Sequence, residues 1–163
     1  MQTIGPSSDP GSAKGRQAIA QLITFQIADQ TLGADIMAIR EIRTWSKMAP
    51  LPNSPAYVCG VANLRGVVLP VIDLSSRLGW AQAEPSDKHV VIVLQHRDQL
   101  KGILVDSVSD IVTVRPEDVQ PVPDVSGAAS EFLQSIATIE GRMVMMLALD
   151  RVLSNDEDLA EAA

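Results

Sequence analysis

The feature that most constrains the fold of this chain is an internal repeat. Residues 22–44 align with residues 91–113 without a gap, and seven of the 23 aligned positions are identical. About one or two identities would be expected by chance at ordinary composition. Residues 62–66 also resemble residues 137–141, after about 6 extra residues in the connecting loop. We therefore expect two similar structural units that pack against each other.

The apolar pattern predicts that both units are built from short strands. Each half supplies about five short apolar runs separated by Gly and Pro turns, the pattern of a small closed β-barrel. The runs expected to form strands are residues 22–28, 31–36, 60–64 and 67–72, followed by residues 90–94, 102–106, 108–114, 136–140 and 142–149. Residues 37–42 fit either a helix or a strand. We also expect two short helices, one over residues 74–78 with Asp73 as its N-cap and one capped by Asp150.

The repeat and the composition together suggest how the chain is divided. We expect one folded region over residues 20–154, with a first barrel over about residues 20–80 and a second over about residues 88–153. Residues 1–19 are rich in Gly, Pro and Ser, which predicts a disordered leader. Residues 155–163 are acidic, which predicts a solvated C-terminal tail.

The composition limits the possible partners. Of the 163 residues, 46% are hydrophobic but only 3% are aromatic, so the core must be built from aliphatic side chains and Met. A net charge of −7 and a pI near 4.7 argue against nucleic acid or an anionic membrane as the main partner. Cys59 is the one cysteine of the sequence, which fits a reducing cytosol. The longest apolar run, residues 143–149, is too short to insert in a membrane, so we expect a cytoplasmic protein.

The sequence offers no set of residues for catalysis or metal binding. His89 and His96 bracket one predicted strand, and exposed strand-end histidines are favoured over a metal pair, because an odd spacing puts their side chains on opposite sides. Cys59 is expected to be a buried apolar filler. The methionines within residues 143–146 could bind a partner, although core filling is favoured. We therefore predict that the protein is not an enzyme and uses neither a cofactor nor a metal ion.

A tight hairpin over residues 60–74 carries the main candidates for recognition. Gly66 suits the positive φ that such a turn needs, so Asn63 and Arg65 would lie at the tip of an apolar scaffold. A permanently charged side chain on a rigid tip suits recognition, whereas an isolated Arg is more often a solvated surface charge. The matching tip of the second half carries Glu140, and this difference in sign suggests that at least one tip has a particular partner.

Motifs spread along the chain combine into the pattern of a known family. They are Phe25…Gly33-x-Asp35-Ile36, Ile39-x-Glu41-Ile42-Arg43, Pro55-Ala56-Tyr57-Val58-x-Gly60-Val61-x-Asn63-Leu64-Arg65-Gly66, Pro70-Val71-Ile72-Asp73-Leu74, Gly102-Ile103-x-Val105-Asp106-x-Val108-Ser109-Asp110 and Ile139-x-Gly141. Together these motifs resemble CheW-type chemotaxis coupling proteins over about residues 20–153. The resemblance implies an all-β fold with short helices, made of two SH3-like five-stranded β-barrels, in agreement with the repeat.

The resemblance also implies a function. Proteins of this type are non-catalytic adaptors that couple the cytoplasmic tip of methyl-accepting chemoreceptors to the CheA histidine kinase, at receptor arrays in the membrane. The same domain occurs in CheA and CheV proteins, but the chain has room for neither a kinase nor a receiver domain, so a stand-alone adaptor is expected. Two other readings stay open. One is a paralogous CheW-like adaptor of a non-flagellar pathway, such as surface motility or a second array. The other is a small enzyme that uses the groove between the barrels.

In the family, the receptor binds in the groove between the two barrels. The positions of this sequence that match the receptor-binding residues are Ile39, Glu41, Gly60, Asn63, Arg65 and Val108. Apolar Ile39 and Val108 would bury against a receptor helix, while the charged pair would set its register. Each residue also has a simpler reading. Ile39 and Val108 hold equivalent repeat positions and could be plain core, and Glu41 could simply pair with Arg43 or Arg65.

The resemblance further implies contacts with the regulatory domain of CheA at the apolar ends of the barrels. Val68 matches one such position, although a core role is about equally expected. Residues 119–125 match the segment that closes rings with the kinase, which gives Gln120, Asp124 and Val125 as further candidates. Val125 stands where an aromatic residue is common in enteric relatives.

Overall fold

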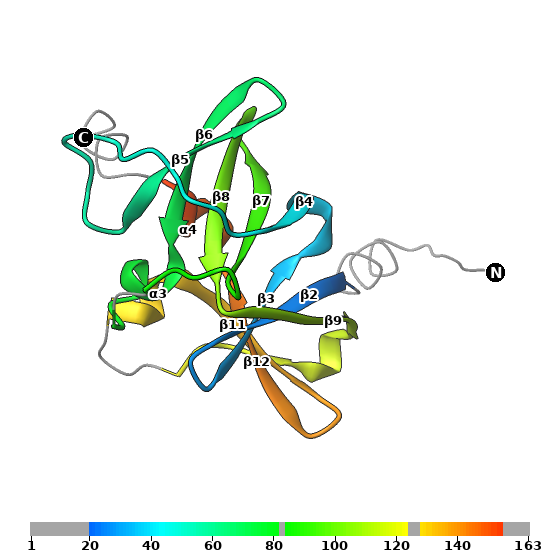
Figure 1. The fold of residues 1–163 in the computed structure, drawn as a ribbon. Helices are drawn as coiled ribbons and strands as arrows, with labels where there is room; N and C mark the ends of the chain where they lie inside the picture. The colour runs from blue at the N-terminus through cyan, green and yellow to red at the C-terminus, as the bar shows by residue number, and fades with distance from the viewer. Residues whose placement is uncertain (1–19, 82–83, 124–127, 155–163) are drawn as a thin grey trace.

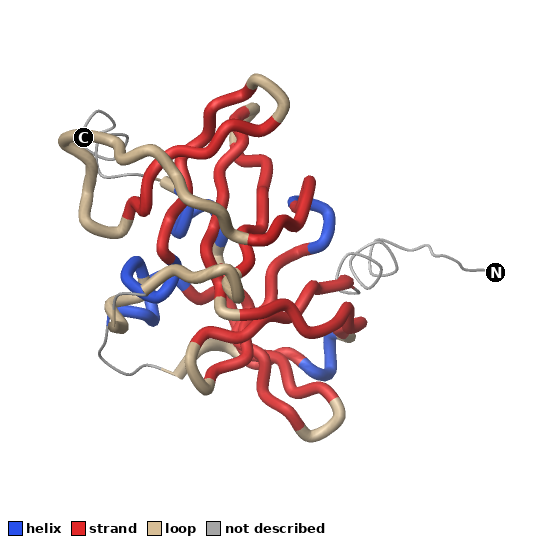
Figure 2. Tube along the Cα trace, in the orientation of Figure 1, coloured by secondary structure: helices blue, strands red, loops and turns tan. Residues whose placement is uncertain are grey.

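The computed structural model describes residues 20–81, 84–123 and 128–154. The predicted leader at residues 1–19 and the predicted tail at residues 155–163 lie outside the described residues. Within the described part, the protein consists mainly of β-strands in two sheets, with short helical segments around them (Figure 1, Figure 2). The prediction of an all-β fold with short helices is confirmed.

One sheet has five strands and the other has six. The five-stranded sheet has the order β4-β7-β8-β6-β5 and contains β4 (Ile39–Thr44), β5 (Val58–Leu64), β6 (Val67–Asp73), β7 (Val90–His96) and β8 (Gln99–Val105). The six-stranded sheet has the order β10-β11-β12-β3-β2-β9 and contains β2 (Ala20–Ile27), β3 (Gln30–Asp35), β9 (Ser107–Val114), β10 (Val119–Gln120), β11 (Leu133–Ile139) and β12 (Arg142–Leu147). Two pairs are parallel, β6 with β8 and β12 with β3, and the other named pairs are antiparallel.

Each sheet takes strands from both halves of the chain. β7 and β8, from the second half, complete the sheet of β4, β5 and β6, while β2 and β3, from the first half, complete the other sheet. A barrel over about residues 20–80 followed by a barrel over about residues 88–153 is therefore wrong as a division of the chain. The two halves have exchanged their first hairpins. The repeat survives the exchange, because the orders β4-β7-β8-β6-β5 and β9-β2-β3-β12-β11 place equivalent strands in equivalent positions.

A short crossover explains how the exchange is made. Residues 37–42, which fitted either a helix or a strand, divide between the 3-10 turn η1 (Ile36–Ala38) and the start of β4. The backbone N–H of Met37 donates to Oδ1 of Asp35 over 2.9 Å, which stabilises this turn. The chain thus leaves the six-stranded sheet at Asp35 and enters the five-stranded sheet at Ile39.

The main hydrophobic core lies between the two sheets. It joins buried side chains of β2 and β3, such as Phe25 and Leu32, to side chains of β7 and β8, such as Ile92 and Ile103. A second apolar cluster lies inside the five-stranded unit and a third inside the six-stranded unit. The aliphatic composition of the chain therefore fills three cores, and the central one fixes the two units against each other.

Short helical segments cover the edges of the sheets. They are α3 (Leu74–Arg77), η2 (Pro116–Asp118), η3 (Ala128–Phe132) and α4 (Leu149–Leu153). Asp73 holds the N-cap position of α3 as predicted, although its side chain makes no capping hydrogen bond there. The prediction that Asp150 caps the last helix is wrong, because the N-cap of α4 is Ala148. Across the described residues, no helix has the length and apolar character needed to cross a membrane.

Arg77 ties α3 to the end of α4. Its guanidinium donates to the carbonyl oxygens of Val152, Arg151 and Ser154 over 3.2, 3.2 and 2.5 Å. The same group lies over the ring of Tyr57, 4.2 Å from the centroid. One cation thus satisfies the last carbonyls of α4 and holds the C-terminal segment against the five-stranded unit.

Candidate functional site

The two outer strands β4 and β9 line a groove between the units. Cross-strand partners share one face of a sheet. Ile39 pairs with Leu94, and Val108 pairs with Phe25, and both partners are buried in the main core. The side chains of Ile39 and Val108 therefore lie on the core-facing sides of β4 and β9, where they are half-buried and pack against that core. They contribute to the core and to the surface together, so the two readings of these residues are compatible.

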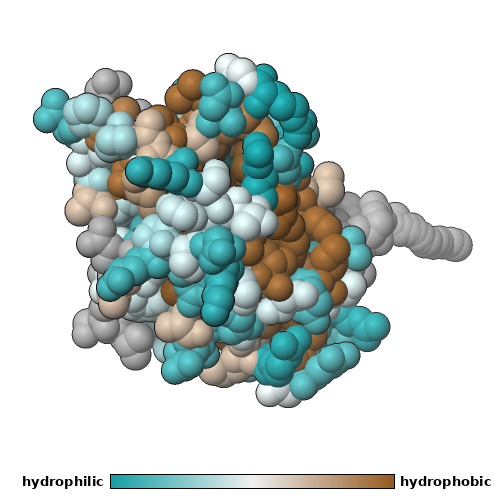
Figure 3. Space-filling model, in the orientation of Figure 1, coloured by the Kyte–Doolittle hydropathy of each residue, from teal (hydrophilic) through white to brown (hydrophobic). Residues whose placement is uncertain are grey.

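Two more isoleucines extend the same apolar surface. Ile42 pairs with the buried Ile92, and Ile111 pairs with the buried Ile23, yet Ile42 is 41% exposed and Ile111 is 55% exposed. Figure 1 shows β4 above β9 on the same side of the molecule, and Figure 3 shows a hydrophobic area between these two levels. The sequence prediction missed both residues. Their identity at equivalent repeat positions was the signal that could have found them.

The hairpin of β5 and β6 stands at one end of the groove wall and has the predicted turn. Arg65 and Gly66 form the turn with φ values of 51° and 88°. The backbone N–H of Gly66 donates to Oδ1 of Asn63 over 2.9 Å. Asn63 therefore shapes the tip by an intraturn hydrogen bond, a use of Asn that is common in tight turns.

Arg65 is held in place by an acidic partner on β4. Its guanidinium forms an ion pair with the carboxylate of Glu41, and Nε of Arg43 lies 3.5 Å from the same carboxylate. Glu41 thus pairs with both arginines that the sequence offered as alternatives. The side chain of Arg65 remains 74% exposed, which leaves several of its donors available to a partner. The structure brings Glu41, Asn63 and Arg65 to one place.

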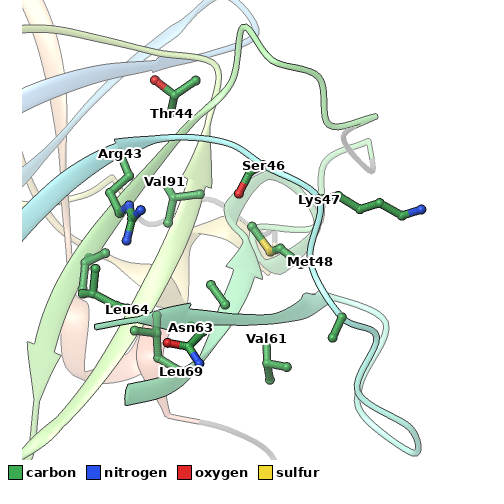
Figure 4. Close-up of a pocket in the computed structure, with 13 residues that line it drawn as sticks. Arg43, Thr44, Ser46, Lys47, Met48, Val61, Asn63, Leu64, Leu69 and Val91 are labelled. Atoms are coloured by element: carbon green, nitrogen blue, oxygen red, sulfur yellow. The ribbon is translucent and has the colours of Figure 1, made fainter. Parts of the chain in front are cut away.

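A cavity of about 350 Å³ lies beside this ion pair (Figure 4). Apolar side chains of the five-stranded unit form its floor, including Leu64, Leu69 and Val91. Arg43 and Asn63 stand at its rim, and Lys47 points away from it. The cavity opens into the interior of the five-stranded unit, so we assign it to incomplete closure of that unit.

Gly60 has a structural role at the base of the hairpin. It has φ +154°, and a Cβ at this position would lie 2.5 Å from the carbonyl oxygen of Ala49. The segment around Ala49 runs against β5 and exchanges two backbone hydrogen bonds with Val61, of 2.8 and 3.2 Å. Gly60 therefore permits a close approach of two backbones. Its predicted receptor contact stays a prediction.

The predicted kinase-binding residues divide between two places. Val68 is 62% exposed on β6, next to the tip, so its side chain is available to a partner rather than buried in the core. Gln120 is exposed on β10, at the edge of the other sheet. The structure does not bring Val68 and Gln120 together. The remaining two candidates, Asp124 and Val125, lie outside the described residues.

The histidines are not the exposed strand-end residues that the sequence suggested. His96 is buried, and its Nε2 lies 2.8 Å from Oδ1 of Asp150, while His89 is half-buried with Nε2 3.4 Å from Oδ1 of Asp106. Each imidazole finds a carboxylate from a distant part of the chain, and these partners are what draw the rings inward. The hydrogen bond from His96 and the nearby charge of Arg97 lower the pKa of Asp150.

The thiol of Cys59 is also unsuited to chemistry. Burial, together with the charge of Asp73, raises its pKa to about 12, so it is protonated at neutral pH. Among the described residues, no group of three or more His, Cys, Asp or Glu side chains could hold a metal ion. Of the methionines in residues 143–146, Met145 and Met146 pack against cores as predicted, whereas Met143 is 66% exposed.

Comparison with protein families identifies the chain. The CheW-like domain matches residues 21–157, and the chain belongs to this family. It is 49% identical over 138 residues to the chemotaxis protein CheW of Rhizobium meliloti strain 1021, covering 84% of this chain and 89% of that protein. It is 46% identical over 145 residues to the probable chemotaxis protein CheW of Rhizobium etli, covering 88% of this chain and 94% of that protein.

A solved structure supports the same assignment. The scaffolding protein TtCheW from Thermoanaerobacter tengcongensis superposes with a TM-score of 0.78 at 26% sequence identity, covering 84% of this chain and 94% of that chain. The two sheets described above therefore form the two SH3-like units of the CheW fold. The expected resemblance and fold are confirmed.

Proposed function

We propose that the protein is a non-catalytic adaptor that couples the cytoplasmic tip of methyl-accepting chemoreceptors to the CheA histidine kinase. The observation that carries the proposal is the apolar groove between β4 and β9, which has an exposed arginine fixed beside it. We place the protein in the cytoplasm, associated with chemoreceptor arrays in the membrane. Membership of the CheW-like family and the likeness to a scaffolding protein support this function.

The groove has the chemistry to receive a receptor helix. Ile39, Ile42, Val108 and Ile111 offer an apolar surface from two strands, which suits the apolar face of an amphipathic helix. Arg65 is kept in one position by Glu41, so it can bind an acidic or carbonyl group of that helix without first becoming ordered. We infer that the apolar residues supply affinity and that the charged pair supplies register.

The exposed apolar end of the β5–β6 hairpin is the proposed contact for the regulatory domain of CheA. Val67 and Val68 are large hydrophobic residues that remain exposed there. Gln120, on the other sheet, would belong to a second contact, together with Asp124 and Val125. An adaptor with kinase contacts on both units could bridge two kinase molecules, as ring closure requires.

Titration calorimetry against the regulatory domain of a CheA kinase from the same cell tests the kinase half of the proposal. We expect saturable one-to-one binding, with the heat lost for Val68→Ser. The matched control is Met143→Ser, which changes the equivalent exposed position of the other hairpin and should leave this binding unchanged. Absence of heat at high protein concentration would contradict the proposal and redirect the search for partners.

A second candidate is a paralogous CheW-like adaptor of a non-flagellar chemosensory pathway, such as surface motility or a second array. One curated relative has a different name, the protein FrzA of Myxococcus xanthus, and it is 27% identical over 121 residues. The higher identity to proteins named CheW favours the first candidate. The receptor and kinase genes next to the gene for this protein would distinguish the two.

A further inference from the structure

The two hairpin tips of the protein have the same backbone and opposite charge. In one tip Asn63 pairs with Val68 across the turn Arg65-Gly66, and in the other Thr138 pairs with Met143 across the turn Glu140-Gly141. Arg65 and Glu140 both have φ 51°. The equivalent positions differ in one respect that matters for binding, because one turn begins with a cation and the other with an anion.

Each tip also exposes an apolar side chain at the equivalent position. Val68 is 62% exposed and Met143 is 66% exposed. A side chain of this size that remains in solvent on a rigid hairpin is a candidate for burial against another molecule. Both tips therefore combine one charged and one apolar group in the same arrangement.

The charge around each tip extends the difference. At the first tip, Glu41 is flanked by two arginines, Arg43 and Arg65, so that tip has an excess of positive charge. At the second tip, Arg142 lies 3.8 Å from the carboxylate of Asp110, and the exposed Glu140 gives an excess of negative charge. The two tips are thus complementary to each other.

We propose that copies of this protein associate head to tail, with the β5–β6 tip of one copy against the β11–β12 tip of the next. Figure 1 places the two tips at opposite ends of the molecule, so one copy cannot satisfy both of its own tips. A contact between two different surfaces leaves one tip of each kind open and can add further copies. Another copy of this chain is the occupant that has the required charge and the required apolar group on the matching backbone.

The contact is small, so the association is weak. Each tip offers one hairpin end, well below the area of a stable protein interface, and the charged groups are exposed. The association therefore grows with protein concentration and falls with added salt, because salt screens charges at exposed sites. Since the first tip includes Val68, a bound kinase domain and a second copy compete for it.

The test uses the full chain with the tip charges exchanged. Arg65→Glu gives a protein with two acidic tips, and Glu140→Arg gives a protein with two basic tips. Both substitutions place at φ 51° a residue that the other tip already accommodates in that conformation. Glu117→Arg, at an exposed position of η2, is the matched charge control, and circular dichroism checks that each variant is folded.

Sedimentation velocity at low salt, over increasing concentration, gives the result. We expect association of the wild type and of Glu117→Arg. For Arg65→Glu alone and for Glu140→Arg alone, we expect an association constant lower by about tenfold or more. An equimolar mixture of these two variants should associate again, because acidic tips then meet basic tips. Met143→Ser should also weaken association, which tests the apolar part without any change of charge.

Three outcomes would overturn the proposal. They are a wild type that stays monomeric up to about millimolar concentration, charge variants that associate alone as well as the wild type, and a mixture that associates no better than its components. The measurement needs neither the receptor nor the kinase. Its failure therefore leaves the proposed adaptor function as it stands.

Discussion

Glu41 and Arg65 form an ion pair although they belong to opposite edges of the five-stranded sheet. Glu41 lies on β4, the first strand in the sheet order, and Arg65 begins the turn that follows β5, the last strand. The sheet must therefore curl until its two edges approach. The backbone hydrogen bonds between Ala49 and Val61 continue the closure, and the cavity between Arg43 and Leu69 marks where it is incomplete. Arg65 thus closes the barrel and serves the proposed recognition from the same position.

Arg65→Glu should abolish coupling to receptors while the protein remains folded. The substitution reverses the charge at the groove and puts two carboxylates together, but an exposed ion pair contributes only about 1 kcal/mol or less to stability. Co-sedimentation with receptor-containing membranes measures coupling, and thermal unfolding measures stability. Arg142→Glu, which removes the ion pair with Asp110 in the other unit, is the control and should retain coupling. An unfolded Arg65→Glu protein would remove the support for Arg65 as a recognition residue.

Gly60→Ala should destabilise the protein by about 2–4 kcal/mol. The new Cβ would lie 2.5 Å from the carbonyl oxygen of Ala49, and φ +154° is a conformation that L side chains rarely adopt. Chemical denaturation gives the free energy of unfolding. Gly66→Ala is the control, since a Cβ there meets no atom within 4 Å and only the positive φ opposes it, which costs about 1–2 kcal/mol. Equal losses for the two variants would show that the approach of Ala49 is not limiting.

Arg77→Met should lower the free energy of unfolding by about 2–3 kcal/mol. The variant keeps most of the aliphatic length but leaves the carbonyls of Val152 and Ser154 without the guanidinium that satisfies them. Urea titration followed by circular dichroism measures the change. Arg97→Met, which removes an exposed arginine 3.6 Å from Asp150, should change stability by less than about 1 kcal/mol. A small effect of Arg77→Met would mean that α4 is held mainly by its buried apolar residues.

The pairing of His96 with Asp150 should give a pH dependence at the acidic end. The pKa of Asp150 lies below its usual value of 3.8 in the folded protein, so the carboxylate stabilises the fold above that pH. This stabilisation is lost as the pH falls through the lowered folded pKa. Denaturation of the wild type and Asp150→Asn at pH 6 and pH 3 should therefore show a difference in stability that shrinks in acid. Asp98→Asn, in the exposed turn after His96, should show no such change, and a constant difference for Asp150→Asn would contradict the assignment.

Cys59 should react slowly with alkylating reagents in the folded protein. With its pKa raised to about 12, the thiolate that attacks such reagents is scarce at pH 8. We expect a rate with iodoacetamide at least about a hundredfold below that of the urea-unfolded chain, measured by mass spectrometry. Comparable rates in the two states would show that the thiol is neither buried nor protonated.

Much of the site could be predicted from the sequence, because it depends on local rules. Arg65-Gly66 has a residue tolerant of positive φ where a tight turn needs one, and the structure has that turn. The same rule holds for Glu140-Gly141. Ile42 and Ile111 were missed because their exposure depends on how the edge strands β4 and β9 face the groove. His96 was misplaced because its partner, Asp150, lies 54 residues further along the chain.

The sequence by itself determined the strands, their turns and the duplication, since alternating apolar residues and glycine turns act over a few residues. The tertiary structure alone decided which hairpin completes which sheet. The repeats are similar, so the β2–β3 hairpin and the β7–β8 hairpin have nearly the same edges and apolar faces, and either one suits either place. The choice depends on the parallel pairings of β6 with β8 and of β12 with β3, on the short η1 crossover and on the shared core between the sheets. These long-range contacts form only when the whole chain is packed, and they also create the groove.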